Sequence, residues 1–90
     1  MYRYRATERF WTSFYRLSVT QKQSVRKAWI IFKVNPFDPR LRAHKIHKLS
    51  QTYKRIIYAL EIEANLRAVF FIDGNRIVTL DIGTHDVYKG

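Results

Sequence analysis

The end of the chain places three side chains that can handle protons within four positions. His85, Asp86 and Tyr88 directly follow an apolar run that closes with Ile82 and Gly83. An imidazole titrates near neutral pH and can accept or donate a proton, while a phenol can donate one or stack on an aromatic base. The tail is therefore a candidate site for proton transfer, although the same residue types are common in solvated chain ends.

A second candidate is an arginine inside an apolar strand pattern. Arg67 alternates with Val69 and Phe71, so we expect the three side chains on one face of a strand. A guanidinium among apolar side chains lowers stability unless it is paired or lies at an open edge. Two interpretations remain open. Arg67 either pairs with Glu61 across a hairpin or extends into solvent, or it is an anion-binding residue held by the sheet.

A third candidate is the basic segment 40–49, which holds two of the three histidines. Leu41, Ile46 and Leu49 are spaced to anchor it while its charged side chains stay in water. His44 and His47 are either catalytic or part of a solvated basic strip, and the pattern leaves both interpretations open. The local conformation of this segment is not determined by its sequence.

The net charge is strongly positive and unevenly distributed. The chain has 17 Lys and Arg against 7 Asp and Glu, which gives a formal charge of +10. Residues 1–55 contain 14 basic and 2 acidic side chains, whereas residues 56–90 contain 3 and 5. Such a field attracts RNA, DNA or an acidic partner protein. A basic surface that serves only solubility is the alternative.

The composition excludes several kinds of site. With no cysteine, disulfides, thiolate nucleophiles and sulfur-ligated metals are absent. The histidines lack further ligands at matching spacing, so we expect neither a metal nor another cofactor. No apolar run is long enough to cross a bilayer, and the first residues are too polar for a signal peptide. We therefore expect a soluble, cytoplasmic protein without membrane contact.

Periodicity predicts one α+β domain over residues 1–90. An antiparallel hairpin of two helices, with its aromatic stripes in the core, is expected to pack on a small antiparallel sheet. Thr7 is the predicted cap of the first helix, and a capping box at residues 20–23 is predicted for the second. The predicted segments are strands 2–5, 56–62, 66–72 and 76–82, and helices from 8 to about 18 and from 20 to about 34.

The order of these elements resembles the RelE/ParE superfamily of bacterial toxins. The most specific motifs are LRAVF at residues 66–70 and IGTHDVY at residues 82–88, and the resemblance covers nearly the whole chain. It implies a metal-independent ribonuclease that cuts messenger RNA on the ribosome and is held inactive by a cognate antitoxin. In such an enzyme the 2′-hydroxyl of the RNA attacks the adjacent phosphate, so the protein must move protons and stabilise negative charge.

The resemblance also implies roles for the residues named above. Arg67 corresponds to the arginine that contacts the scissile phosphate, and His85 to the proton donor or acceptor near the C-terminus. Tyr88 corresponds to a tyrosine that stacks on a nucleobase or assists proton transfer. If His44 or His47 is the general base, His85 is the acid. The implied phosphate-binding cations of the basic segment are Arg42, Lys45 and Lys48.

Two features differ from the superfamily pattern. Some members use a glutamate before the first long strand as general base, and near that position this chain has only His44 and His47. Where other members carry arginines in the last strand or tail, this chain has Asp81 and Asp86. Because a carboxylate repels a phosphate, we expect Asp86 to orient His85 or to face solvent.

Two other functions compete with the nuclease. A toxin of the gyrase-binding ParE branch would share the fold and cut nothing. A non-catalytic nucleic-acid-binding module would need only the positive charge and exposed aromatic side chains. A short acidic reading frame beside the gene would favour either toxin over the simple binding module.

Overall fold

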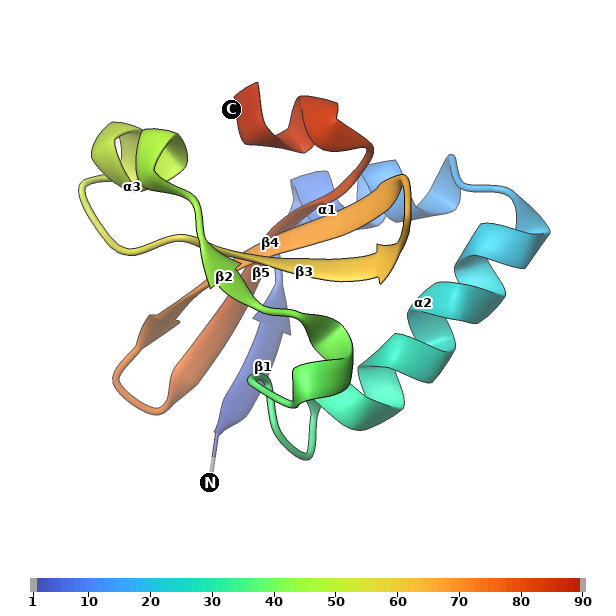
Figure 1. Cartoon of the computed structure of the whole chain (residues 1–90), viewed down its shortest axis with the longest axis horizontal. Coiled ribbons are helices and arrows are strands. Elements are labelled where there is room, and N and C mark those ends of the chain that lie inside the picture. The colour runs from blue at the N-terminus through green and yellow to red at the C-terminus, as the bar shows by residue number, and fades with distance from the viewer. Residues whose placement is uncertain (1, 90) are drawn as a thin grey trace.

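A five-stranded mixed sheet in the order β1-β5-β4-β3-β2 organises the fold, and helices cover both of its faces (Figure 1). The computed structural model describes residues 2–89, without the side chains of His85 and Lys89. The elements are β1 (Arg3–Ala6), α1 (Glu8–Tyr15), α2 (Val19–Phe32), η1 (Pro39–Leu41), β2 (His44–Lys45), α3 (His47–Tyr53), β3 (Tyr58–Glu63), β4 (Leu66–Asp73), β5 (Arg76–Gly83) and η2 (His85–Lys89), where η marks a 3-10 helix. The predicted α+β class is confirmed. No helix among residues 2–89 is long and apolar enough to span a membrane.

The prediction of a purely antiparallel sheet is wrong for the first strand. β1 pairs parallel with β5, with Arg3 opposite Arg76 and Ala6 opposite Thr79. Almost the whole chain separates these two strands, so no tight turn imposes an antiparallel direction. The pairs of β3 with β4 and of β4 with β5 are antiparallel as expected, and β2, a strand that the sequence did not predict, also pairs antiparallel with β3.

The starts of the two long helices are set by side-chain caps. The Thr7 hydroxyl accepts a hydrogen bond from the Phe10 N–H at the start of α1, as predicted. The capping box of α2 is formed by Ser18 and Gln21 and not by residues 20–23. Both stretches have the same spacing of hydroxyl and amide residues, and the helix begins at the earlier one.

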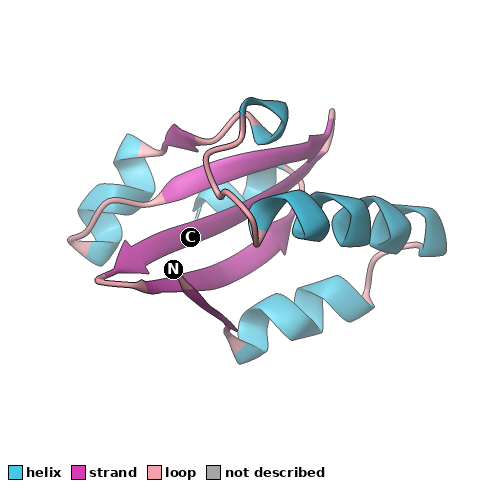
Figure 2. Ribbon diagram, turned by 90° about the horizontal axis from the view of Figure 1, so that it is seen from below, coloured by secondary structure: helices cyan, strands magenta, loops and turns pink. Residues whose placement is uncertain are grey.

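Helices α1 and α2 lie on the same face of the sheet and contact it separately. α1 packs mainly on β5, while α2 contacts β3 and η1 (Figure 2). The expected stripe of core aromatics is only half correct. Phe10, Phe14 and Phe32 are buried, but Trp11, Tyr15 and Trp29 remain 46%, 66% and 42% exposed. These three rings border a groove between the helices.

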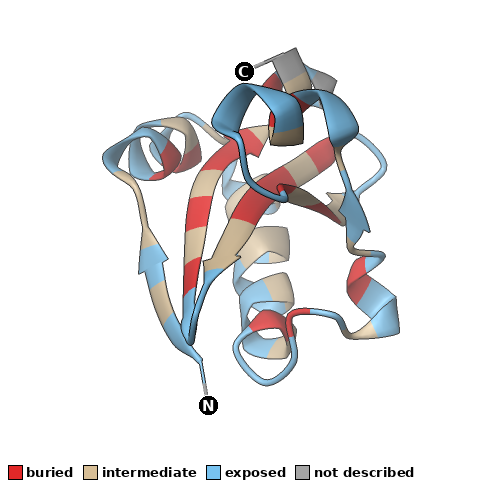
Figure 3. Cartoon of the chain, turned by 90° about the vertical axis from the view of Figure 1, so that its left-hand side faces the viewer, coloured by how far each residue is buried: buried red, intermediate tan, exposed pale blue. Residues whose placement is uncertain are grey.

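The opposite face of the sheet is covered by two segments that are distant in sequence. α3 contacts η2, so the basic segment and the C-terminal tail lie side by side (Figure 1). Leu49, Ala59, Val69 and Val87 are buried together between them and the sheet. Buried residues are concentrated in the central strands β3, β4 and β5, whereas the edge strands β1 and β2 contain none (Figure 3). The C-terminal tail, for which the sequence predicted neither a helix nor a strand, is a short 3-10 helix.

Asp81 joins α1 to an irregular point of β5. Val69 pairs with Asp81 and Phe70 with Thr79, so one extra residue bulges from β5.

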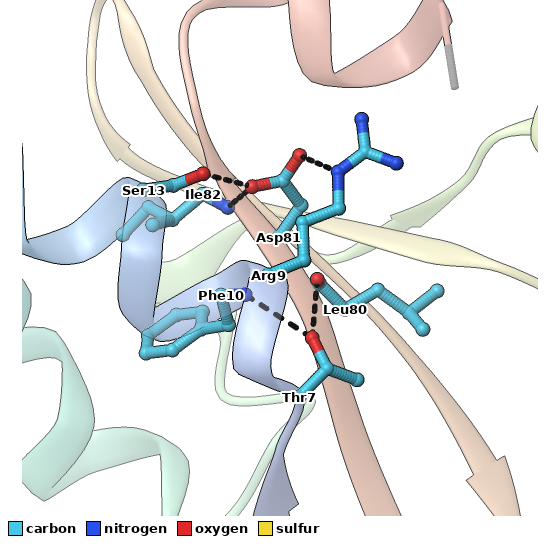
Figure 4. Close-up of polar contacts among 7 residues, drawn as sticks. All are labelled: Thr7, Arg9, Phe10, Ser13, Leu80, Asp81 and Ile82. Carbon is cyan, nitrogen blue, oxygen red and sulfur yellow. Dashed lines mark hydrogen bonds and ion pairs between the residues drawn. The ribbon is translucent and has the colours of Figure 1, made fainter.

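The buried Asp81 carboxylate accepts hydrogen bonds from the Ser13 hydroxyl at 2.6 Å and from the Ile82 N–H at 2.8 Å (Figure 4). The remaining contacts of this region are an ion pair between Asp81 and Arg9 at 3.1 Å and a hydrogen bond from the Thr7 hydroxyl to the Leu80 carbonyl. Asp81 therefore holds α1 in place, a role that sequence reasoning did not identify.

Candidate active site

The side chain of Arg67 is anchored at the start of β4. Its Nη1 donates a hydrogen bond to the Glu63 carbonyl at 2.8 Å and lies 3.5 Å from Oε1 of Glu61. Glu61 is the residue directly opposite Arg67 on β3. Only 11% of the Arg67 side chain is exposed, compared with 31% for Glu61. Of the interpretations left open by the sequence, a solvent-extended arginine is therefore wrong and the cross-strand pair with Glu61 is confirmed.

Tyr88 reaches the same place from the C-terminal segment. It packs against the buried cluster under η2 and carries a hydroxyl close to Arg67. Burial raises the pKa of Tyr88 above its ordinary value of 10.0, while the charge and hydrogen bond of Arg67 act in the opposite direction. The carboxylate of Glu61 adds a smaller upward effect. A protonated phenol, a guanidinium and a carboxylate thus meet on one face of the sheet.

His44 lies on the same face, at the edge of the sheet. It pairs with Ala59, which precedes Glu61 by two positions on β3, and residues two apart on a strand share a face. His44 is two strands and two residues away from Arg67. With the usual spacings of a sheet, the two Cα atoms lie about 12 Å apart. The Nδ1 atom of the exposed His44 ring is 2.9 Å from the Arg42 carbonyl. A carbonyl can only accept, so Nδ1 carries a hydrogen, and Nε2 is the ring atom that this bond leaves available to a substrate.

The other candidates of the basic segment surround this edge. His47 is the first residue of α3 and is exposed, as is Lys48 beside it. Lys45 is the second residue of β2, and Arg42 ends η1 with a left-handed backbone at φ 50°. All four are exposed cations or bases next to the covered face, on a segment whose conformation the sequence had left undetermined.

The remaining tail residues follow Gly83, the residue opposite Arg67 on β5. His85 begins η2, and its side chain lies outside the described part of the structure. The backbone N–H of the exposed Asp86 donates a weak hydrogen bond to the Thr84 hydroxyl at 3.4 Å. A Cβ on Gly83 would lie only 3.1 Å from Cγ1 of Val87, so the lack of a side chain here lets η2 fold back on the sheet.

Two residues of this face were missed or undervalued from the sequence. Glu61 was considered only as a structural partner of Arg67, although its carboxylate also acts on Tyr88. Arg55 was not considered, and its guanidinium lies 4.2 Å from the ring centre of Phe71. Phe71 shares the face of Arg67 through period-two alternation, but no local sequence pattern links Arg55 to this face.

A metal would need several convergent ligands. Across residues 2–89, leaving aside the two side chains that are not described, no group of three or more His, Asp or Glu residues is arranged to hold a metal ion.

No protein-family model matches the chain, and no curated protein sequence matches it. Its fold, however, matches solved structures. YafQ from E. coli BL21(DE3) matches over 100% of both chains with a TM-score of 0.71 and 11% identical residues. The copy in the E. coli DinJ–YafQ complex matches over the same extent, with a TM-score of 0.67 and 12% identity. A copper-bound mutant toxin from Helicobacter pylori matches over 97% of this chain and 98% of its own, with a TM-score of 0.70 and 18% identity. The chain therefore has the fold of the RelE-like toxins.

Proposed function

We propose that the protein is the toxin of a type II toxin–antitoxin pair and that it acts as a metal-independent endoribonuclease on messenger RNA at the ribosome. The observation that carries this proposal is the ion pair of Arg67 with Glu61 on the sheet face against which Tyr88 packs. A planar, permanently charged guanidinium fixed by a backbone carbonyl and a carboxylate is oriented in advance for a phosphate.

The proposed reaction needs no group from outside the RNA and the protein. The 2′-hydroxyl oxygen attacks the adjacent phosphorus, a P–O2′ bond forms and the P–O5′ bond breaks. A general base takes the proton of the 2′-hydroxyl, and a general acid gives a proton to the departing O5′. The products are a 2′,3′-cyclic phosphate and a 5′-hydroxyl, and the charge that builds up on the phosphoryl oxygens faces Arg67.

We assign the base to His44 and the acid to His85. His44 is exposed, and the bond of its Nδ1 to the Arg42 carbonyl leaves Nε2 as the ring atom to take the proton. Glu61 is already paired with Arg67, so its carboxylate is a weaker candidate and serves to orient the guanidinium. Tyr88, protonated at neutral pH, donates a hydrogen bond to a phosphoryl oxygen or stacks on a neighbouring base.

The proposed partner is a cognate antitoxin, and the proposed compartment is the cytoplasm, where translated messages are found. The solved complex of the structural neighbour YafQ with DinJ supports a protein partner for this fold. The charge of +10 supports either an acidic antitoxin or the RNA-rich surface of a ribosome as a second contact.

The test is to induce the protein in bacterial cells and follow growth, the 5′ ends of translated messages and plasmid supercoiling. The proposal expects arrested growth with new internal 5′-hydroxyl ends and unchanged supercoiling. Growth arrest with intact messages and altered supercoiling would support the gyrase-binding alternative instead. Normal growth with intact messages would leave only the nucleic-acid-binding module.

A further inference from the structure

The sheet face that carries Arg67 is covered over part of its length. η2 contacts β4 and β5, and α3 contacts η2, so these two segments lie over the region around the buried Val69. Phe71 comes four residues after Arg67 on the same face of β4, with its Cα about 13 Å from that of Arg67. From there the β4–β5 hairpin extends away from α3 and η2 (Figure 1). This end of the face is therefore accessible to a ligand.

A row of side chains crosses three strands at this end. Phe71 pairs with Val78 of β5, and Val78 pairs with Arg5 of β1. Phe71 and Val78 are half-buried, whereas Arg3 and Arg5 are exposed. The two arginines alternate with Tyr4, whose ring packs on α2, so they face the other side of the sheet. Arg5, at the sheet edge, also borders the groove between α1 and α2.

Arg55 reaches the same row from the loop after α3. Its guanidinium lies 4.2 Å from the ring centre of Phe71, and its backbone N–H donates to the Ser50 carbonyl at 3.2 Å. Arg55 is exposed. A guanidinium that lies on an aromatic ring offers its outer face to a nucleobase and its edge to a phosphate. We call Arg3, Arg5, Arg55, Phe71 and Val78 the open sheet face.

The charge of the open sheet face is positive. It has three arginines and no acidic residue, and the exposed Lys54 precedes Arg55 in the chain. At the hairpin end, Asp73 stands directly opposite Arg76, so these two residues add no net charge. Such a surface attracts a polyanion. Because bases stack on side chains when they are not paired in a duplex, single-stranded RNA matches this surface better than folded RNA.

We propose that the open sheet face binds single-stranded RNA, with a base on the stack of Arg55 and Phe71 and phosphates on Arg3 and Arg5. The RNA is the segment of the message next to the cleaved bond, because the open sheet face and Arg67 lie on one side of the sheet. The proposal rests on the proposed function in naming the message as the source. Binding is measured on RNA that cannot be cut, so failure of cleavage and failure of this surface are separate results.

The probe is a fluorescein-labelled RNA strand that is 2′-O-methylated throughout, so no 2′-hydroxyl is free to attack a phosphate. Strands of about three and about fifteen nucleotides are compared, because the longer one can span both Arg67 and the open sheet face. An RNA duplex of the longer length and labelled polyglutamate represent the other occupants. The readout is the dissociation constant from fluorescence anisotropy over a range of salt concentrations.

The longer strand should bind the parent protein about tenfold or more tighter than the shorter one. Arg3→Gln/Arg55→Gln should reduce this gain to less than about threefold and lower the salt slope by about 1.4, or about 0.7 for each lost phosphate contact. Arg55→Lys should keep the slope and weaken the longer strand about threefold, because lysine keeps the charge but not the planar stack. The matched control Lys27→Gln/Lys33→Gln removes two exposed cations of α2, on the other face, and should change neither value.

Circular dichroism verifies that all variants are folded. Equal affinity of the parent for the two strand lengths, or equal losses in the two double variants, would overturn the proposal. Equal affinity for the duplex would overturn it in favour of folded RNA. Polyglutamate that binds as tightly as the longer strand, and loses affinity in Arg3→Gln/Arg55→Gln, would overturn it in favour of an acidic protein.

Discussion

The guanidinium of Arg67 lies 3.5 Å from the carboxylate of Glu61, directly across the ladder between β3 and β4. This pair joins two strands at the point where the C-terminal segment folds back and brings Tyr88 to the same face. A cation held by a neighbouring carboxylate is ordered before any ligand arrives. A phosphate with two oxygens can then replace the single carboxylate contact of Glu61.

Because the pKa of Tyr88 is raised in the folded protein, the free energy of unfolding should change with pH in the alkaline range. In the unfolded chain the phenol ionises near 10.0, whereas in the folded protein burial keeps it protonated to higher pH. The contribution of Tyr88 is therefore fully present below about pH 10 and is lost as the pH rises through the folded-state pKa. Tyr4, whose pKa is raised by burial and by Tyr2, behaves in the same way. Thermal midpoints from about pH 9 to about pH 11 should fall less steeply in Tyr88→Phe than in the parent protein.

The control for this prediction is Tyr15→Phe, because Tyr15 is 66% exposed. This variant should follow the parent curve. A Tyr88→Phe curve that also follows the parent would show that the phenol is not held protonated by burial.

Substitution of the three candidate bases separates the proton acceptor from the residue that orients Arg67. We expect His44→Gln to lower the cleavage rate by about 100-fold or more and to remove the acidic limb of the pH profile. His47→Gln should leave the shape of the profile unchanged. Glu61→Gln should weaken RNA binding or raise KM while the acidic limb remains. Loss of the acidic limb in Glu61→Gln and its retention in His44→Gln would reverse the assignment.

Gly83 is expected to matter because η2 folds closely over it. A methyl group here would meet Cγ1 of Val87 at 3.1 Å and push on the segment that carries Tyr88. Gly83→Ala should cost about 1 kcal/mol of unfolding free energy and lower cleavage more than this loss of stability explains. Gly74→Ala is the matched control. It places a methyl group in open space at a backbone φ of +63°, so it should cost a similar amount without affecting cleavage.

Asp81 should be a stability residue and not a catalytic one. Its carboxylate accepts from Ser13 and Ile82 and pairs with Arg9, on the side of the sheet where α1 packs. Asp81→Asn should lower the unfolding free energy by about 1 to 3 kcal/mol in urea denaturation, because an amide cannot accept all of these bonds. Asp73→Asn, at an exposed hairpin position, should change it by less than about 0.5 kcal/mol. Equal stability of the two variants would contradict the anchoring role.

The sequence was sufficient where local patterns decide structure. The cap at Thr7 and the face shared by Arg67 and Val69 follow from side-chain chemistry and period-two alternation, and both are found. The parallel direction of β1 and the conformation of residues 40–49 depend on contacts with strands far along the chain. No local pattern encodes those contacts.

The candidate site, too, combines residues that local patterns predict with an arrangement that depends on contacts between distant segments. Arg67 could be singled out because it interrupts an apolar strand, and the C-terminal motif could be recognised by its residue types. That Tyr88 returns to Arg67 depends on η2 folding over Gly83, a packing event between segments about twenty residues apart. The anchoring role of Asp81 could not be predicted, because its bulged, helix-facing position is not visible in the alternation of β5.

The most direct measurement compares cleavage by Arg67→Lys with cleavage by the parent protein. Arg76→Lys, an exposed arginine at the other end of the sheet, is the matched control. Lysine keeps the charge but cannot bond a carbonyl, a carboxylate and a phosphate through one planar group. With folding verified by circular dichroism, 5′-end mapping of translated messages should show a loss of about 100-fold or more in Arg67→Lys and none in Arg76→Lys. Cleavage at the parent rate by folded Arg67→Lys would contradict the assignment of this arginine to the scissile phosphate.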